Sequence, residues 1–119
     1  GRFQGLTHSE AKGASPELYA QWRTAPSQVQ FPGGEGLEDV QARLLALLQE
    51  VAARHRGQSA ALVGHQIVNK VLVCTLLGLD LDQIWRVQQD TCGLDLFQQA
   101  GEGWHAISLN DVCHLSGDR

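Results

Sequence analysis

A short apolar run over residues 59–64 ends in a glycine and is followed at once by His65, and no other segment restricts the possible folds as much. The run lacks the polar–apolar alternation of a half-exposed strand, so it predicts a strand buried on both faces of a parallel sheet. Such a strand needs parallel neighbours joined by crossover connections, and the sequence supplies no second unit of this kind. The sequence therefore predicts an α/β domain of which the other half is elsewhere.

Helical patterns flank this run. From residue 37 to residue 51, apolar residues recur at steps of three and four opposite a polar face, which predicts an amphipathic helix of about five turns. A more uniformly apolar helix is predicted from about residue 67 to residue 77, where Gly78 ends it. A short helix is predicted over 81–87, and the segments 94–97 and 104–109 predict a hairpin around a glycine-bearing loop.

The first 36 residues predict short helices and turns. Thr7 and Glu10 have the spacing of a capping box, and Ser15-Pro16 is a second helix start. The stretch Phe31-Pro32-Gly33-Gly34-Glu35-Gly36 predicts a loop. We therefore expect a single partial domain over 1–119, with a lid-like helix and loop region over 1–36 and a sheet-and-helix core over 37–119.

Charge and cysteine content restrict the partners and the compartment. Nine Lys and Arg against thirteen Asp and Glu give a net charge of −4, which argues against a nucleic-acid partner. The apolar run 71–74 is far shorter than the ~20 residues of a membrane span, and we expect neither a membrane partner nor a signal peptide. Three cysteines without a CxxC pair disfavour a disulfide framework and indicate a reducing cytoplasm.

His65 is the first candidate for chemistry. At the carboxyl end of a parallel strand it would lie where open α/β sheets bind ligands, and the N-terminus of the next helix would favour a phosphate there. An imidazole in that place can donate a hydrogen bond to a phosphoryl oxygen or move a proton. A histidine that packs against the sheet for structural reasons is an equally good interpretation of the residues alone.

Two other clusters of residues have weaker implications. The glycine-rich loop over 32–36 is either a flap over a substrate or a plain connection, and it matches neither GxGxxG nor a Walker loop. His105, Cys113 and His114 lack the fourth ligand and the paired spacing of a zinc site. We therefore expect no metal and no other cofactor.

Five motifs in order resemble the histidine phosphatase superfamily, the phosphoglycerate mutase-like phosphatases, and most closely their alpha-ribazole phosphatase and fructose-bisphosphatase-like branch. Residues 1–7 resemble its G-x-W-E-G-L-T stretch, with Phe and Gln in place of Trp and Glu. Residues 32–43 resemble its P-G-G-E-S-x-x-D-V-x-x-R, and 61–65 match the strand that carries its second histidine. Residues 76–79 and 109–111 complete the series.

The resemblance covers the C-terminal half of the family's domain, so it implies an incomplete three-layer histidine-phosphatase-like domain. One buried parallel-type strand, flanking helices and a C-terminal hairpin are expected in it. Family members begin with a strand carrying Arg-His-Gly, whose histidine takes the phosphoryl group before water removes it. This sequence contains no Arg-His-Gly.

Individual residues take their expected roles from the same resemblance. His65 matches the family's second histidine, which contacts the transferred phosphoryl group. Glu35 matches a residue of the flap, and Gln66 stands where glycine usually follows the histidine, so both are expected at the substrate. Asp90 lies in a Gln89-Asp90-Thr91 stretch that resembles a turn near the site, and no chemistry is assigned to it.

Three interpretations of function stay open. The chain is an inactive remnant whose sheet edge a second copy covers in a homodimer, or it is half of a split enzyme that a complementing N-terminal half completes. Alternatively it is a non-catalytic phosphate-binding or dimeric interaction module on the same scaffold. The ligand in each case is phosphate or a phosphomonoester.

Overall fold

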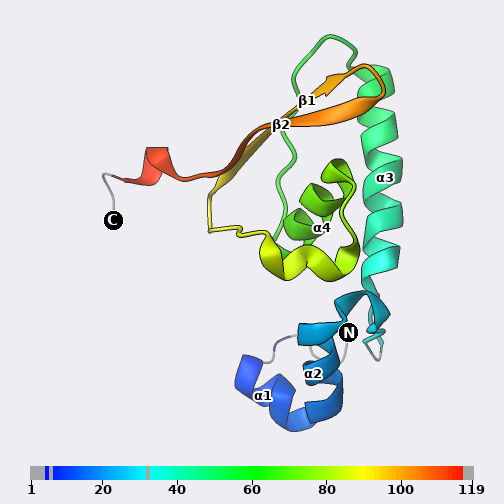
Figure 1. Ribbon diagram of the computed structural model, residues 1–119, viewed down its shortest axis with the longest axis vertical. Coiled ribbons are helices and arrows are strands. Elements are labelled where there is room, and N and C mark those ends of the chain that lie inside the picture. The colour runs from blue at the N-terminus through cyan, green and yellow to red at the C-terminus, as the bar shows by residue number, and fades with distance from the viewer. Residues whose placement is uncertain (1–4, 6, 32, 117–119) are drawn as a thin grey trace. The chain divides into compact units, whose positions relative to one another are not determined.

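The computed structural model describes residues 5, 7–31 and 33–116, and Figure 1 labels its helices and strands. The chain divides into two compact units, Gly1–Val63 and Gly64–Arg119. The first unit contains α1 (His8–Ala14), α2 (Pro16–Thr24), the 3-10 helix η1 (Pro26–Gln28) and α3 (Leu37–Arg54). The second contains α4 (Gln66–Leu77), η2 (Leu81–Arg86), β1 (Leu94–Ala100), β2 (Gly103–Asp111) and η3 (Cys113–Leu115). The structure is thus a mixture of helices and a C-terminal hairpin, while the expected regions 1–36 and 37–119 stay predictions.

The short helices of the first unit begin as their sequences predict. The Thr7 hydroxyl oxygen accepts a hydrogen bond from the Glu10 N–H at 3.1 Å, and the Glu10 carboxylate accepts one from the Thr7 N–H at 3.0 Å. This reciprocal pair satisfies two N–H groups at the start of α1. Pro16 lies in the first turn of α2, where its missing N–H costs nothing. Trp22 of α2 meets Phe31 edge-on, with 5.1 Å between the ring centroids.

The amphipathic helix α3 confirms the periodicity of its sequence. It spans 18 residues, and the Asp39 carboxylate at its start accepts a hydrogen bond from the Gly36 N–H at 3.0 Å. Leu37 is the buried residue of this helix, whereas Leu45 and Leu47 are 43% and 41% exposed. The periodicity therefore predicts the helix correctly, but most of its apolar stripe is not deeply buried.

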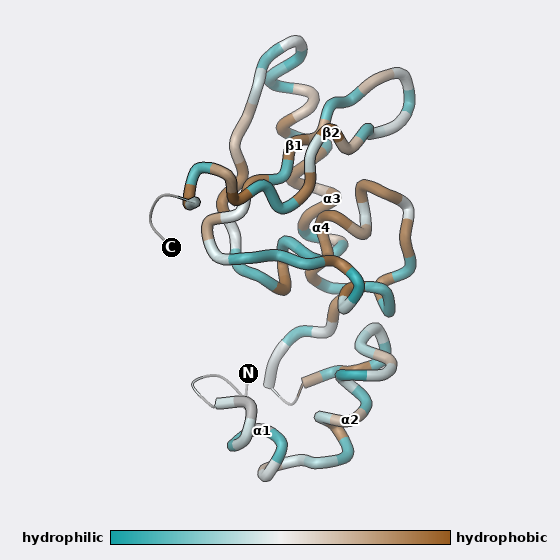
Figure 2. The backbone as a smooth tube through the Cα atoms, turned by 60° about the vertical axis from the view of Figure 1, so that its left-hand side comes forward, coloured by the Kyte–Doolittle hydropathy of each residue, from teal (hydrophilic) through white to brown (hydrophobic). Residues whose placement is uncertain are grey.

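The core of the second unit lies between α4 and η2. Figure 2 shows the strongly apolar character of α4. The helix ends at Gly78, whose left-handed φ of +71° lets its N–H return to the last turn. Five apolar side chains of the two helices are 0–7% exposed, namely Val71, Val73, Cys74, Leu81 and Ile84.

The predicted hairpin is confirmed. β1 and β2 pair antiparallel, with Ala100 opposite Gly103 beside the turn and Leu94 opposite Asp111 at the far end. Gly101 takes a positive φ of +63° in this turn, which a glycine adopts without strain. Within the described ranges this is a sheet of two strands, and each strand has the other as its partner.

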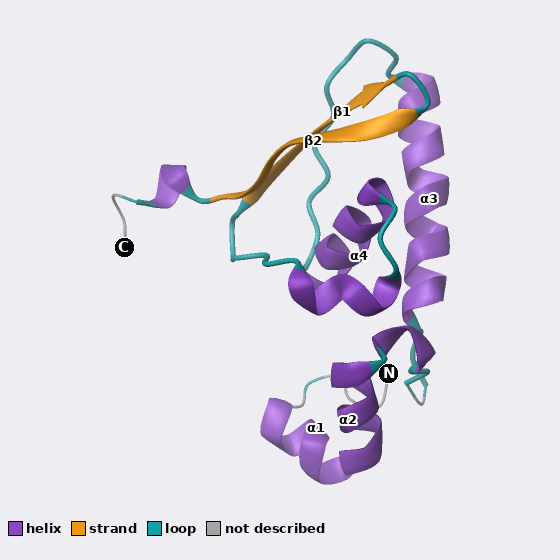
Figure 3. Ribbon diagram, in the orientation of Figure 1, coloured by secondary structure: helices purple, strands orange, loops and turns teal. Residues whose placement is uncertain are grey.

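The prediction of a buried parallel strand over 59–64 is wrong for this structure. The segment has no regular secondary structure (Figure 3), and Val63 is 99% and Leu62 43% exposed. A strand forms its backbone hydrogen bonds with neighbouring strands, and the two strands of the described chain pair with each other. The run therefore has a buried strand's sequence without the sheet that would bury it.

Candidate functional site

His65 lies directly before α4 as its N-terminal capping residue, with an extended backbone (φ −110°, ψ 166°). Its carbonyl oxygen accepts the Asn69 N–H at 2.8 Å, which closes the first turn of the helix. Its imidazole makes no capping hydrogen bond, and the residue is exposed. The N-terminus of a helix attracts anions through its N–H groups and its dipole, so an imidazole here stands where a phosphate would be stabilised.

Gly64 shapes the approach to this position. A Cβ at Gly64 would lie 2.6 Å from the Asn69 side-chain oxygen and 3.8 Å from a Val68 methyl carbon. A larger residue would therefore displace the Asn69 side chain at the first turn of α4. The glycine lets the chain enter the helix closely beside that turn.

Gln66 ties the beginning of α4 to the loop that follows η2. Its side-chain Nε2 donates a hydrogen bond to the carbonyl oxygen of Gln89 at 3.2 Å. Gln89 is itself 5% exposed, so this contact lies at a buried part of the loop. The structure thus brings the segment around Asp90 alongside the residue that follows His65.

A polar network continues from this loop into the hairpin. The Asp90 N–H donates to Asn110 Oδ1 at 2.9 Å, and Asn110 Nδ2 donates to Asp90 Oδ2 at 3.1 Å. Asp95 Oδ1 accepts from the Asn110 N–H at 2.8 Å and from Gln89 Nε2 at 3.0 Å. In the described ranges every buried side-chain nitrogen or oxygen has a hydrogen-bond partner. A fully satisfied network of this kind fixes one arrangement of its members.

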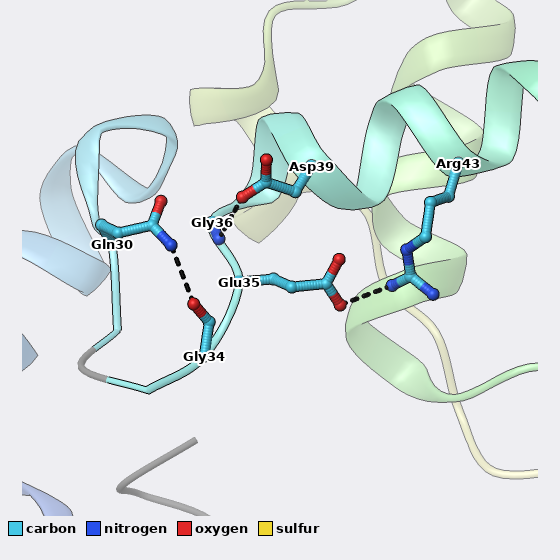
Figure 4. A network of polar contacts seen from close by, with 6 residues as sticks. All are labelled: Gln30, Gly34, Glu35, Gly36, Asp39 and Arg43. Carbon is cyan, nitrogen blue, oxygen red and sulfur yellow. Dashed lines mark hydrogen bonds and ion pairs between the residues drawn. The ribbon is translucent and has the colours of Figure 1, made fainter.

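Glu35 belongs to the first unit, where it anchors the glycine-rich loop to α3. Its carboxylate Oε1 lies 2.8 Å from Arg43 Nη2, and Gln30 Nε2 donates to the Gly34 carbonyl oxygen at 2.8 Å (Figure 4). A Cβ on Gly36 would lie 2.8 Å from the Gln30 side-chain oxygen, so the loop closes tightly at this point. The structure thus gives Glu35 a partner within its own unit, while His65 and Gln66 belong to the second unit.

The three cysteines are free, and Cys74 is the buried one. Burial raises the pKa of the Cys74 thiol, Lys70 opposes this shift, and Asp80 adds to it. A protonated thiol is a poor nucleophile, so Cys74 is inert at neutral pH.

The described residues hold no group of three or more His, Cys, Asp or Glu that could bind a metal ion. No helix of the described chain is long and apolar enough to cross a membrane.

The sequence predicts no role for Lys70, Gln89 or Asn110, although the structure places all three in the polar surroundings of α4 and the hairpin. Lys70 is 7% exposed, and its Nζ donates a hydrogen bond to the Val87 carbonyl oxygen. Its signal in the sequence is a single charged residue within the apolar helix 67–77. Gln89 and Asn110 lie in two of the stretches that resemble the family, but the resemblance does not predict their contacts, which join residues 15 to 23 positions apart.

Known proteins resemble this chain over almost its whole length. Phosphoserine phosphatase 1 of Hydrogenobacter thermophilus is 31% identical over 115 residues, covering 97% of this chain and 54% of its own. The 2-carboxy-D-arabinitol-1-phosphatase of Triticum aestivum is 32% identical over 111 residues, covering 91% of this chain and 22% of its own. The solved structure of Bacillus stearothermophilus YhfR matches with a TM-score of 0.89 at 28% identity, over 97% of this chain and 57% of that chain.

These matches show which family the chain belongs to and how much of the relatives' length it covers. The chain spans about half the length of phosphoserine phosphatase 1 and of YhfR. The family described as the histidine phosphatase superfamily (branch 1) matches residues 1–112, which include His65, Gln66 and Glu35. Because that match covers nearly the whole sequence, this chain belongs to the histidine phosphatase superfamily, branch 1.

Proposed function

We propose that this chain contributes one side of a site for phosphomonoester hydrolysis, in which His65 contacts the transferred phosphoryl group. The observation that carries the proposal is an exposed imidazole at the N-terminus of α4, in a chain that belongs to a histidine phosphatase family. Two relatives are named as phosphatases of different phosphate esters, a phosphoserine and a carboxyarabinitol phosphate. The proposal therefore names a class of substrate, the phosphomonoesters.

The surroundings of His65 suit the electrostatics of phosphoryl transfer. Negative charge spreads over the phosphoryl oxygens in the transition state, and positioned donors that face those oxygens supply much of the rate. The imidazole of His65 can donate one hydrogen bond, and the first N–H groups of α4 add the positive end of the helix dipole. These groups stabilise the charge of the phosphoryl group and hold it in place.

Glu35 and Gln66 remain proposed substrate-binding residues. Gln66 Nε2 carries two hydrogens, of which the Gln89 carbonyl engages one, so the amide can still donate to a ligand. Glu35 pairs with Arg43 through side chains that are 50% and 65% exposed, and such surface pairs contribute only about 0–1 kcal/mol. The glycine-rich loop can therefore rearrange around a ligand at little cost.

Hydrolysis also needs a nucleophile, which we propose comes from a complementing N-terminal half. This chain contains no Arg-His-Gly, and it spans 54% of phosphoserine phosphatase 1 and 57% of YhfR. Its exposed segment around Leu62 and Val63 is an unpaired apolar stretch, which is a template for the strand of another polypeptide. The complementing half would supply both that strand and the histidine that receives the phosphoryl group.

The same exposed segment favours a second candidate function. A second copy of the chain could cover it, which would give a homodimeric phosphate-binding module without catalysis.

The proposal also places the protein in a reducing cytoplasm, because its three cysteines are free thiols.

The experiment joins this chain to the part of YhfR that it does not match and measures hydrolysis of p-nitrophenyl phosphate and phosphoserine. We expect turnover by the joined protein and none by the chain alone, because the proposal assigns the nucleophile to the half that complements this chain. His65→Ala should lower turnover about 100- to 1,000-fold, the usual effect of removing one positioned donor. His105→Ala is the matched control, an exposed histidine of β2, and should leave the rate within about twofold.

Two outcomes would contradict the proposal. A folded joined protein without turnover would refute the hydrolytic function. Turnover that His65→Ala leaves unchanged would refute the role of His65. Sedimentation of the chain alone over a dilution series then tests the second candidate, since a concentration-dependent dimer that binds inorganic phosphate without turnover would favour the homodimeric module.

A further inference from the structure

Two side chains of α4 hold the backbone of the loop segment 87–90. Gln66 Nε2 donates to the carbonyl oxygen of Gln89 at 3.2 Å. Lys70 Nζ donates to the carbonyl oxygen of Val87, whose backbone is extended (φ −103°, ψ 111°). The helix therefore contacts two carbonyl groups that are separated by a single residue.

The two donors lie one turn apart on α4. Side chains at positions i and i+4 of a helix lie on one face, about 6 Å apart along the axis. Gln66 and Lys70 therefore reach the segment 87–90 from one face of α4.

The hairpin holds the same segment from another direction. The Asn110 side chain forms two hydrogen bonds with Asp90, one to its backbone N–H and one to its carboxylate. Asn110 has a left-handed backbone with φ +50°, a conformation that asparagine tolerates better than most residues. The Asp95 carboxylate then joins Asn110 to Gln89. The segment 87–90 is thus fixed at both ends.

The burial of Lys70 argues for a positional role. Its residue is 7% exposed, and burying an ammonium group costs free energy unless its surroundings compensate fully. A methionine of similar length would fill the same space without a charge. The hydrogen bond from Lys70 to the Val87 carbonyl oxygen offsets part of that cost, and it also fixes the position of the loop backbone.

We infer that Lys70, together with the Gln66–Gln89 contact, holds the segment 87–90 beside His65, and that Lys70 is a positioning residue for that histidine. The loop contact of Gln66 lies next to His65 in the chain, because His65 directly precedes Gln66. The carbonyl oxygen of His65 also closes the first turn of α4. The inference rests on the proposed function, in which His65 contacts a phosphoryl group. Lys70 itself touches no substrate.

The test compares the 119-residue chain with its Lys70→Met variant by NMR and thermal unfolding. Inorganic phosphate should shift the imidazole signals of His65 saturably in the wild type. Two effects of Lys70→Met on the melting temperature oppose each other, because a buried charge is lost while the Val87 carbonyl oxygen loses this donor. The His65 signals and the Asp90 amide signal should move, and the phosphate Kd should rise about three- to tenfold. Lys12→Met, at the chain's other lysine, is the matched control and should change none of these.

A merely structural lysine would give the opposite pattern. If Lys70→Met changed the melting temperature and left the His65 signals and the phosphate Kd unchanged, the inference would be overturned. Should that variant fail to fold, Gln66→Met removes the other donor from an exposed residue and should move the same signals, and unmoved signals would overturn the inference. If the wild type shows no phosphate-dependent shift, phosphate binding by the chain alone is refuted and the joined protein decides the hydrolytic function. The Lys70→Met displacement of the His65 and Asp90 signals still decides the positioning role.

Discussion

Two apolar segments flank His65, and they differ in burial far more than in sequence. The segment before it is exposed, with Val63 at 99%, whereas α4 after it buries Val71 and Cys74 completely. A helix forms its backbone hydrogen bonds within itself, so α4 needs only an apolar surface to pack on, which η2 supplies. A strand needs a neighbour for the same bonds, and none pairs with 59–64 in the described structure. Two segments of similar apolar composition therefore differ in burial, because the chain provides a packing surface for α4 but no partner strand for residues 59–64.

The largest expected loss of stability comes from a substitution in the buried core between α4 and η2. Ile84→Ala should lower the free energy of unfolding by about 2–5 kcal/mol, because Ile84 is 0% exposed and its loss leaves a cavity beneath α4. Chemical denaturation of the variant measures this. Ile107→Ala is the matched control at a 57% exposed position and should cost much less. Equal losses at the two positions would contradict the assigned core.

A second substitution tests the connection between the loop and the hairpin. Gly93→Ala would place a Cβ 2.5 Å from the Asn110 side-chain oxygen and 3.1 Å from the Asp90 carbonyl oxygen. We expect a loss of about 1–3 kcal/mol, the usual cost of overpacking a closed site. Gly103→Ala has open space around its Cβ and should cost clearly less in the same denaturation experiment. A harmless Gly93→Ala would show that the Asp90–Asn110 contact is loose.

The buried thiol of Cys74 makes the stability of the core around α4 depend on pH. Burial raises the pKa of Cys74 above its usual 9.0, so the folded state holds the proton more tightly than the unfolded state does. Its contribution to stability is therefore fully present well below the ordinary thiol pKa and is lost as the pH rises through that value towards the raised one. Unfolding measured from pH 7 to pH 10 should show this decline, and Cys74→Val should flatten it. An identical decline in that variant would assign it to other groups.

In the chain alone, the smallest loss of stability is expected from a substitution in the exposed segment 59–64. Val63→Ala should change the free energy of unfolding by less than about 0.5 kcal/mol, because the side chain has little to lose. In the protein joined to the unmatched part of YhfR, the same substitution should cost about 1–3 kcal/mol, since the valine is then buried. Denaturation of both proteins measures the difference. A full-sized loss in the chain alone would mean that Val63 is already covered.

Local sequence signals predict the elements that are stabilised locally. The capping pair Thr7 and Glu10, the periodicity of α3 and the glycine-bearing turn of the hairpin each depend on residues close in the chain. Residues 59–64 fail as a predicted strand, because strand formation depends on a partner that the run itself does not specify. The apolar composition indicates a buried environment, and only the rest of a sheet can provide it.

The candidate site divides in the same way. The position of His65 at a helix start follows from the glycine before it and the apolar helix after it. The surroundings of that helix start do not follow, because Gln89 contacts Gln66 across 23 residues and Asn110 contacts Asp95 across 15. Lys70 stands out only as a charge within an apolar helix, and its partner Val87 is known only from the folded structure.

The most direct measurement of the central claim is amide hydrogen exchange at Leu62 and Val63, in the chain alone and in the protein joined to the unmatched part of YhfR. The claim is that this segment is the edge along which the chain is completed into a phosphatase. It predicts fast exchange in the chain alone at every concentration, and slow exchange in the active joined protein, where strand pairing protects both amides. Fast exchange in an active joined protein, or slow exchange in the chain alone, would contradict it.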